Sequence, residues 1–108
     1  MCRATNRGWS TDVDLLVTYD VETVTPAGER RLRKVAKICE AHGHRVQKSV
    51  FEVVCRESDK VRLIAALQAA IDPRRDSIRI YRLPTRALDD VEHLGRPRDI
   101  DPRGPFVI

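Results

Sequence analysis

The sequence has few of the residues on which specialised small folds depend. Its three cysteines, Cys2, Cys39 and Cys55, are odd in number and lack close paired spacing, which argues against a disulfide framework and for a reducing compartment. One tryptophan, two tyrosines and two phenylalanines do not supply the aromatic platform on which RNA-recognition modules stack bases. Apolar runs of membrane-spanning length are absent, and the first dozen residues lack the apolar core of a signal peptide. We therefore expect a cytoplasmic protein without a membrane partner.

Several motifs that signal specific chemistry are also missing. The chain contains no P-loop, no G-x-G-x-x-G fingerprint, no G-x-S-x-G elbow and no paired C-x-x-C motif. Cys39, His42 and His44 form a C-x2-H-x-H cluster, but a fourth zinc ligand is not evident. The histidines are explained more simply as residues at the C-terminus of a helix, where the helix dipole favours positive charge.

What the chain does have is the composition of one globular domain. Its 108 residues are 42% hydrophobic and 33% charged, which is enough for a single modest core. Twenty basic against sixteen acidic residues give a net charge of +4, a mild electrostatic argument for a polyanionic partner. We divide the chain into an N-terminal extension at 1–12, a folded domain at 13–95 and a proline-rich tail at 96–108.

The first strand carries a carboxylate at its end. Residues 13–21, VDLLVTYDV, are apolar nearly throughout, as in a central strand, and alternation places Asp20 on the side of Leu16 and Thr18. A strand-end aspartate often organises a turn by accepting bonds from backbone N–H groups. Alternatively, Asp20 is a hard oxygen ligand for Mg²⁺ or Mn²⁺, completed by waters and substrate phosphate. One carboxylate holds such an ion weakly, so this alternative requires a second copy of Asp20 across a two-fold axis.

A helix follows the strand and carries a basic face. Thr25 caps its start and Pro26 suits its first position, and the helix should run to about His42 and stop at Gly43. Basic residues recur at helical spacing on one side, and this spacing predicts either an ordinary solvated surface or a track for phosphates. The basic ridge consists of Arg30, Arg33, Lys34 and Lys37.

The second half of the domain repeats strands and a helix. Residues 44–55 change the phase of their alternation. A bulge or tight bend near 49–51 would explain this change and predicts two short strands or one kinked strand. Ser58 is the expected cap of a second helix. Residues 76–83, DSIRIYRL, read as a strand, and VEHLG at 91–95 is the candidate for a short last strand.

This order of elements predicts an α+β fold of the ferredoxin-like βαββαβ type. Both helices cover one face of an antiparallel sheet in this plan, and the other face is left open. An open apolar face needs a cover, and a second copy of the chain is the simplest one. We therefore expect a homodimer formed through the open sheet face.

Three stretches of the chain together resemble the CRISPR-associated protein 2 family, the small dimeric component of the spacer-acquisition machinery. They are LLVTYDV, then TPAGERRLRKVAKICEAHGHRVQKSVFE, then DSIRIYRL. The combination of an aromatic-Asp strand end with R-V-Q-x-S-V-F at this distance is specific, although either half alone would be weak. The resemblance runs from about Asp14 to Gly95 and covers neither the first dozen residues nor the proline-rich tail.

The resemblance implies a dimer in which the two copies of Asp20 face each other as metal ligands and catalytic residues. Tyr19 matches the family's aromatic position beside that aspartate and is the second catalytic candidate. Arg45, Ser49 and Phe51 fall on the R-V-Q-x-S-V-F positions, which the family uses in handling nucleic acid or in shaping the site.

Further residues and partners follow from the same resemblance. Arg31 and Arg33 match, more loosely, basic helix residues that bind nucleic acid in the family. The family's activity implies a metal-dependent endonuclease acting on double-stranded DNA or single-stranded RNA, with Mg²⁺ or Mn²⁺ as cofactor. Members also bridge integrase subunits in spacer acquisition, so a DNA-binding adaptor without cleavage is an alternative role. A toxin-like metal-dependent endoribonuclease is a further alternative.

Overall fold

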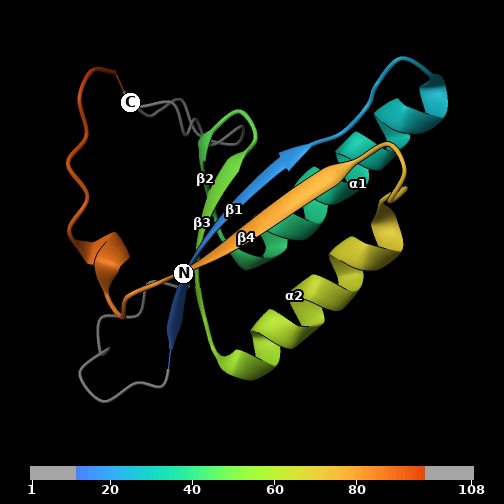
Figure 1. The fold of residues 1–108 in the computed structure, drawn as a ribbon. Coiled ribbons are helices and arrows are strands. Elements are labelled where there is room, and N and C mark those ends of the chain that lie inside the picture. Colours follow the sequence, from blue (N-terminus) through green and yellow to red (C-terminus); the bar gives the residue numbers. More distant parts are fainter. Residues whose placement is uncertain (1–11, 97–108) are drawn as a thin grey trace.

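The chain forms four strands and two long helices over residues 12–96, the part of the chain that the computed structural model describes (Figure 1). The strands are β1 (Val13–Asp20), β2 (His44–Gln47), β3 (Val50–Cys55) and β4 (Ser77–Leu83). The helices are α1 (Pro26–His42) and α2 (Glu57–Ala70), and a short 3₁₀ helix, η1 (Ala87–Asp89), follows β4. The predicted order βαββαβ is confirmed. The expectations for the N-terminal extension and the proline-rich tail fall almost wholly outside the described residues.

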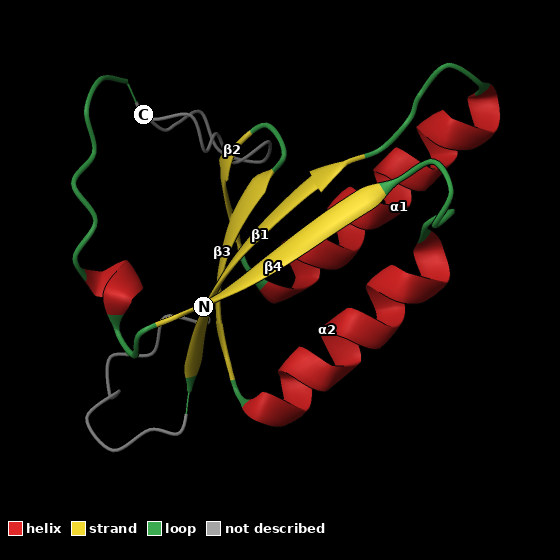
Figure 2. Cartoon of the chain, viewed as in Figure 1, coloured by secondary structure: helices red, strands yellow, loops and turns green. Residues whose placement is uncertain are grey.

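The strands form one antiparallel sheet in the order β2-β3-β1-β4. β1 lies between β3 and β4, which accounts for its nearly continuous apolar run. Figure 2 shows α1 and α2 on the same side of the sheet, and the two helices contact each other there. In the described chain the opposite sheet face carries no long helix, and we call it the open face. The ferredoxin-like arrangement is thus confirmed, whereas the homodimer stays a prediction.

The core fills the space between the helices and the sheet. Its side chains with 0% exposure come from two strands and both helices: Leu15, Val17, Val35, Cys39, Phe51, Val53 and Leu63. On the other side of β1, Leu16 and Thr18 are half-buried and Asp20 is exposed. The alternation read from the sequence therefore places Asp20 on the correct face, the open one.

Both ends of α1 follow the signals in the sequence. The Thr25 hydroxyl accepts a hydrogen bond of 3.1 Å from the backbone N–H of Gly28, and Pro26 occupies the first helical position. At the other end the backbone of Gly43 is extended, with φ of −156°, so no left-handed conformation requires a glycine there. A Cβ at Gly43 would lie 2.5 Å from both the Glu52 carbonyl oxygen and a methyl carbon of Val53. Close approach to β3 is therefore what requires the glycine.

The start of α2 differs from the prediction. The helix begins at Glu57, one residue before the expected cap, and Ser58 lies inside its first turn. Arg56 occupies the cap position without a side-chain hydrogen bond to the helix. The carboxylates of Glu57 and Asp59 in the first turn favour the positive end of the helix dipole, which compensates for the missing cap.

The phase change in residues 44–55 reflects two strands joined by a turn at Lys48 and Ser49. The pairing of β2 with β3 shifts register between Arg45 and Gln47. The turn is the tight bend expected near 49–51, and the register shift is a separate bulge within β2. A bulge bends the strand that contains it and turns the following residues toward a new direction.

The short last strand predicted at 91–95 does not form in the described chain. Pro84 ends β4 without an N–H to continue the ladder, and the chain then turns through Arg86, whose φ is 67°. η1 packs on the open face because Asp14, with 0% exposure, accepts a hydrogen bond of 2.9 Å from the Leu88 N–H. Beyond it, Leu94 is 92% exposed and pairs with no strand of the described chain. Figure 1 shows this segment leading away from the four strands.

Candidate metal and phosphate site at the end of β1

Asp20 is the last residue of β1 and lies on the open face, opposite Ser77 of β4. Its side chain is exposed and has no hydrogen bond or ion pair with any described residue. The aspartate therefore does not organise the turn that follows, because Glu22 N–H donates to Asp76 instead, at 3.1 Å. A free carboxylate at the end of a rigid central strand is available to a ligand.

The donor chemistry of Asp20 fits a hard divalent cation, but one chain supplies only part of a site. Carboxylate oxygens are the ligands that Mg²⁺ takes, usually one or two per site, with waters and phosphate oxygens completing the shell. Within residues 12–96 no group of three or more His, Cys, Asp or Glu side chains lies close enough to hold a metal ion. Within the described residues Asp20 therefore supplies one carboxylate, and waters, phosphate oxygens or a second carboxylate would complete the shell.

Tyr19 precedes Asp20 but faces the core. The residue is 7% exposed, and its ring stacks on Phe51 with 6.1 Å between centroids. Burial raises the pKa of the phenol, and the nearby positive charge of Arg45 only partly opposes this. The phenol is therefore neutral near pH 7 and lies on the face opposite the Asp20 carboxylate.

The R-V-Q-x-S-V-F residues build the turn beside the Asp20 strand end. The Arg45 guanidinium lies 5.0 Å from the centre of the Phe51 ring and donates a hydrogen bond of 2.8 Å to the Lys48 carbonyl. It also pairs with Glu40 of α1 at 3.2 Å. Arg45 is thus held within the fold by two hydrogen bonds and the ring contact, and its expected contact with nucleic acid stays a prediction.

Ser49 contributes through its backbone. Its carbonyl accepts a hydrogen bond of 3.1 Å from the Tyr19 N–H, which extends the pairing of β1 beyond Val50, the first residue of β3. The turn that Arg45 braces is thereby attached to the residue next to Asp20. A site-shaping role for Ser49 and Phe51 is consistent with these contacts.

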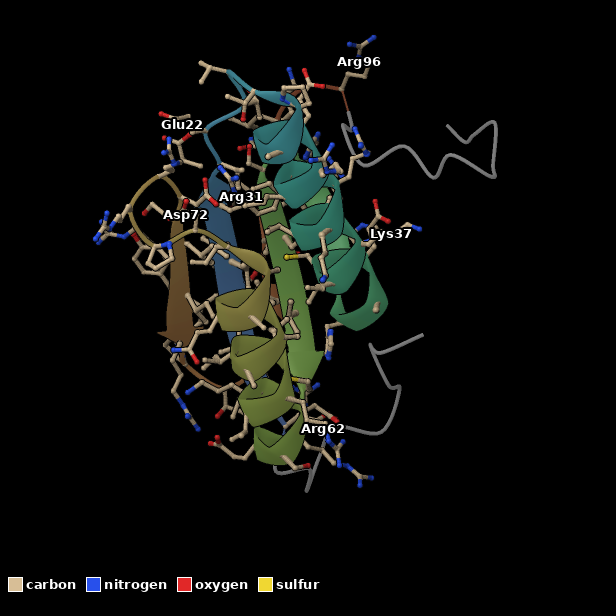
Figure 3. The ribbon with its side chains drawn as sticks, turned by 90° about the vertical axis from the view of Figure 1, so that its right-hand side faces the viewer. Glu22, Arg31, Lys37, Arg62, Asp72 and Arg96 are labelled. Carbon is tan, nitrogen blue, oxygen red and sulfur yellow. The ribbon has the colours of Figure 1, made fainter. Side chains whose placement is uncertain are left out.

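Arg31 is also engaged within the fold, and its expected contact with nucleic acid stays a prediction. Its Nε donates to Asp76 at 2.7 Å and its Nη2 at 3.3 Å, and a further contact of 3.5 Å reaches the Glu22 carbonyl. Figure 3 shows Arg31 in the N-terminal half of α1, on the side toward Glu22 and Asp72. Arg31 thus ties α1 to the loops at the Asp20 end of the sheet.

Asp76 accepts the bonds from Arg31 and was not recognised from the sequence. We call this pair of residues the Arg31–Asp76 clamp. The Asp76 side chain is fully buried and also accepts backbone hydrogen bonds from Asp72 at 2.8 Å and Glu22 at 3.1 Å. Burial alone would raise the pKa of this carboxyl, but the bonds from Arg31 and the two N–H groups hold the pKa below its ordinary value. Because its partners lie up to 54 residues away, no local pattern indicated its role.

The basic ridge is available to a ligand. All four side chains are exposed on α1, and none has a hydrogen bond or ion pair with a described residue: Arg30, Arg33, Lys34 and Lys37. Figure 3 shows Lys37 pointing outward from α1, away from the loops that Arg31 joins. The ridge therefore presents four positive charges along little more than two helical turns.

The Cys39 and His42 positions do not form a metal centre. They belong to no group of three or more metal-ligating side chains within residues 12–96, and Cys39 is fully buried, which raises the pKa of its thiol to about 11. The Nδ1 of His42 lies 2.9 Å from the Ile38 carbonyl oxygen. Cys39 itself is a free thiol in the core.

Comparison with known proteins identifies the family. A family model described as CRISPR associated protein Cas2 matches residues 14–91, nearly the whole described fold. The "CRISPR-associated endoribonuclease Cas2 3" of Rhodospirillum rubrum is 49% identical over 94 residues, which cover 87% of this chain and 99% of that protein. The "CRISPR-associated endonuclease Cas2" of Halalkalibacterium halodurans is 44% identical over 86% of this chain and 97% of its own length.

A solved structure supports the same conclusion. The crystal structure of Streptococcus pyogenes Cas2 at pH 6.5 has a TM-score of 0.67 and 49% sequence identity, and the match covers 76% of this chain and 99% of that one. Within residues 12–96 no helix is both long and apolar enough to cross a membrane. The Asp20 strand end and the R-V-Q-x-S-V-F turn both lie inside the range that the family model matches. The chain therefore belongs to the Cas2 family of CRISPR-associated endonucleases.

Proposed function

We propose that the chain acts in the cytoplasm as a homodimer in CRISPR spacer acquisition, where it binds double-stranded DNA and bridges integrase subunits. We further propose that two copies of Asp20 form a metal-dependent endonuclease site that cleaves double-stranded DNA or single-stranded RNA. The observation that carries the second proposal is the exposed Asp20 carboxylate, which has no partner in the described chain, at the end of the central strand. The names of the relatives, endoribonuclease and endonuclease, agree with it.

The open face supports the dimer. It presents half-buried Leu16 and Thr18 of β1 together with Tyr81 of β4, which is 42% exposed. Covering such a face with a second copy removes apolar surface from water and brings two strand ends toward one axis. A dimer of this kind provides a second carboxylate for the site.

Asp20, the basic ridge and Tyr19 have different roles in the proposed cleavage reaction. Asp20 holds the cation, and the basic ridge holds the flanking phosphates through contacts that do not depend on sequence. When bound, Mg²⁺ or Mn²⁺ orients a water for attack on phosphorus and offsets charge on the scissile phosphate. Tyr19 supports the strand end by packing on Phe51, because its raised pKa makes the phenol unsuited to accept or lose a proton near neutral pH.

The test is cleavage of labelled duplex DNA and single-stranded RNA by the wild type and by Asp20→Asn, with Mg²⁺, Mn²⁺ or a chelator. Glu29→Gln is the matched control, since Glu29 is an exposed carboxylate in the first turn of α1. We expect cleavage to require the metal, to disappear in Asp20→Asn and to persist in Glu29→Gln. Equal cleavage by all three proteins would contradict the catalytic role of Asp20.

The adaptor role is tested separately. Sedimentation of the wild type and Asp20→Asn with duplex DNA and an integrase subunit should give the same ternary complex for both proteins. Binding without any cleavage would leave the adaptor as the function, with Asp20 an interface residue. Failure of both proteins to bind DNA would contradict the bridging role itself.

A further inference from the structure

A second charged residue stands beside Asp20 on the open face. Arg79 of β4 lies opposite Thr18, and the next residue pair along the ladder on this face is Asp20 with Ser77. Arg79 and Asp20 are thus diagonal neighbours across β1 and β4, whose Cα atoms in a sheet are about 7–8 Å apart. A long side chain spans that distance, so an ion pair between them is geometrically available.

The ion pair does not form. Instead the Arg79 guanidinium carbon lies 5.4 Å from the centre of the Tyr81 ring, on the side of Arg79 away from Ser77. Arg79 has no carboxylate partner among the described residues. The ring face attracts the cation and withdraws it from Asp20, which keeps that carboxylate free.

We propose that Arg79 is the phosphate ligand of the Asp20 site and that Tyr81 holds its guanidinium away from Asp20 until a substrate binds. Guanidinium groups recognise phosphate through two parallel N–H bonds, and the scissile phosphate would lie beside the cation that Asp20 holds. The contact with Tyr81 and an exposed ion pair are both weak interactions, so a phosphate competes readily for the arginine. The inference rests on the proposed endonuclease function.

The first experiment compares Arg79→Ala, Arg79→Lys and the control Arg74→Ala in single-turnover cleavage of duplex DNA. Arg74 is an exposed arginine in the turn before β4 with no side-chain partner in the described chain. We expect Arg79→Ala to lower the cleavage rate constant by about 10²–10³-fold, the loss seen when one group that stabilises transition-state charge is removed. Arg79→Lys should recover part of the rate because the charge returns without the planar fork, and Arg74→Ala should match the wild type.

The second experiment measures Mn²⁺ binding by electron paramagnetic resonance, without substrate. Removing the ring in Tyr81→Ala releases Arg79 toward Asp20, so the Kd for Mn²⁺ should rise by about 2–5-fold, the effect of an exposed ion pair. Tyr81→Phe should bind Mn²⁺ like the wild type because its ring face remains. Tyr81→Ala combined with Arg79→Ala should also restore binding, since no cation is left to compete.

The outcomes separate this inference from the proposed function. Normal cleavage by Arg79→Ala together with inactive Asp20→Asn overturns the role of Arg79 and leaves the endonuclease intact. Loss of the dimer in Arg79→Ala, measured by light scattering, also overturns it, because Arg79 is then an interface contact. A wild type that neither binds Mn²⁺ nor cleaves contradicts both proposals.

Discussion

Tyr19 and Asp20 are adjacent in the chain, but their side chains lie on opposite faces of the sheet. The phenol is in the core, 7% exposed and stacked on Phe51, whereas the carboxylate is exposed on the open face. Alternation along β1 enforces this separation. The two residues therefore cannot share one reacting group within a single chain, and their substitution should produce different kinds of defect.

Tyr19→Phe should retain cleavage within about twofold of the wild type, because a proton that stays on the phenol takes no part in proton transfer. Tyr19→Ala should lower the free energy of unfolding by about 3–5 kcal/mol, as removal of a buried aromatic ring does. Urea titration and single-turnover cleavage measure the two effects. A large rate loss in Tyr19→Phe at unchanged stability would show that the hydroxyl acts in the reaction.

Asp76→Asn should lower the free energy of unfolding by about 1.5–3 kcal/mol at pH 7, the value of a hydrogen bond to a charged group. The pKa of Asp76 is depressed in the folded protein, so its contribution is complete above the unfolded value of about 3.9 and is lost as pH falls through the folded pKa. As the pH falls from about 5 to about 2, the free energy of unfolding of the wild type should therefore decrease more than that of the variant.

Asp90→Asn is the control for that experiment, because Asp90 is exposed and its side chain has no partner in the described chain. Its urea midpoint should follow that of the wild type at every pH. Parallel pH profiles for the wild type and Asp76→Asn would show that the Arg31–Asp76 clamp does not depress the carboxyl pKa.

Lys34→Ala combined with Lys37→Ala should weaken binding of duplex DNA regardless of its sequence. Each lost phosphate contact should reduce the slope of log K against log salt by about 0.9, so the double variant should lose about 1.8. Fluorescence anisotropy over a KCl series measures the slope. Arg62→Ala on α2 removes a charge that is paired with Asp59 and should leave the slope unchanged. Equal slopes for all proteins would place the DNA elsewhere on the surface.

Arg45→Lys keeps the positive charge but loses the planar contact with Phe51 and the geometry of the bond to the Lys48 carbonyl. We expect lower stability and a slower cleavage rate with an unchanged salt dependence of DNA binding. That combination of results would show that Arg45 stabilises the turn between β2 and β3 and does not bind a phosphate of the DNA. A smaller salt slope without loss of stability would assign Arg45 to the DNA.

Local signals explain which elements were predicted from the sequence. The apolar run of β1 and the Thr25 and Gly43 boundaries of α1 depend on neighbours within a few residues, and all three are confirmed. Ser58 failed as a cap because acidic residues around it also favour a helix start. The expected strand at 91–95 depends on a neighbouring strand that the described single chain does not supply.

In the candidate site, too, local patterns predicted some residues, whereas contacts between distant residues were not predicted. The face of Asp20 follows from alternation alone, and the exposed ridge follows from helical spacing. The engagement of Arg31 by Asp76 is not visible in the sequence, because 45 residues separate them and only the fold brings them together. Sequence reasoning therefore located the free charges and could not tell which other charges are already bound.

The hydrogen bond from the Leu88 N–H to buried Asp14 fixes where the chain leaves the sheet. Ordering one backbone residue has an entropic cost of about 1–2 kcal/mol. The residues up to Leu88 lose this conformational entropy when the single chain folds, and not when a second molecule binds. In the proposed dimer, two copies would therefore meet through the open face with the segment up to Leu88 already ordered, and association would not have to order that segment.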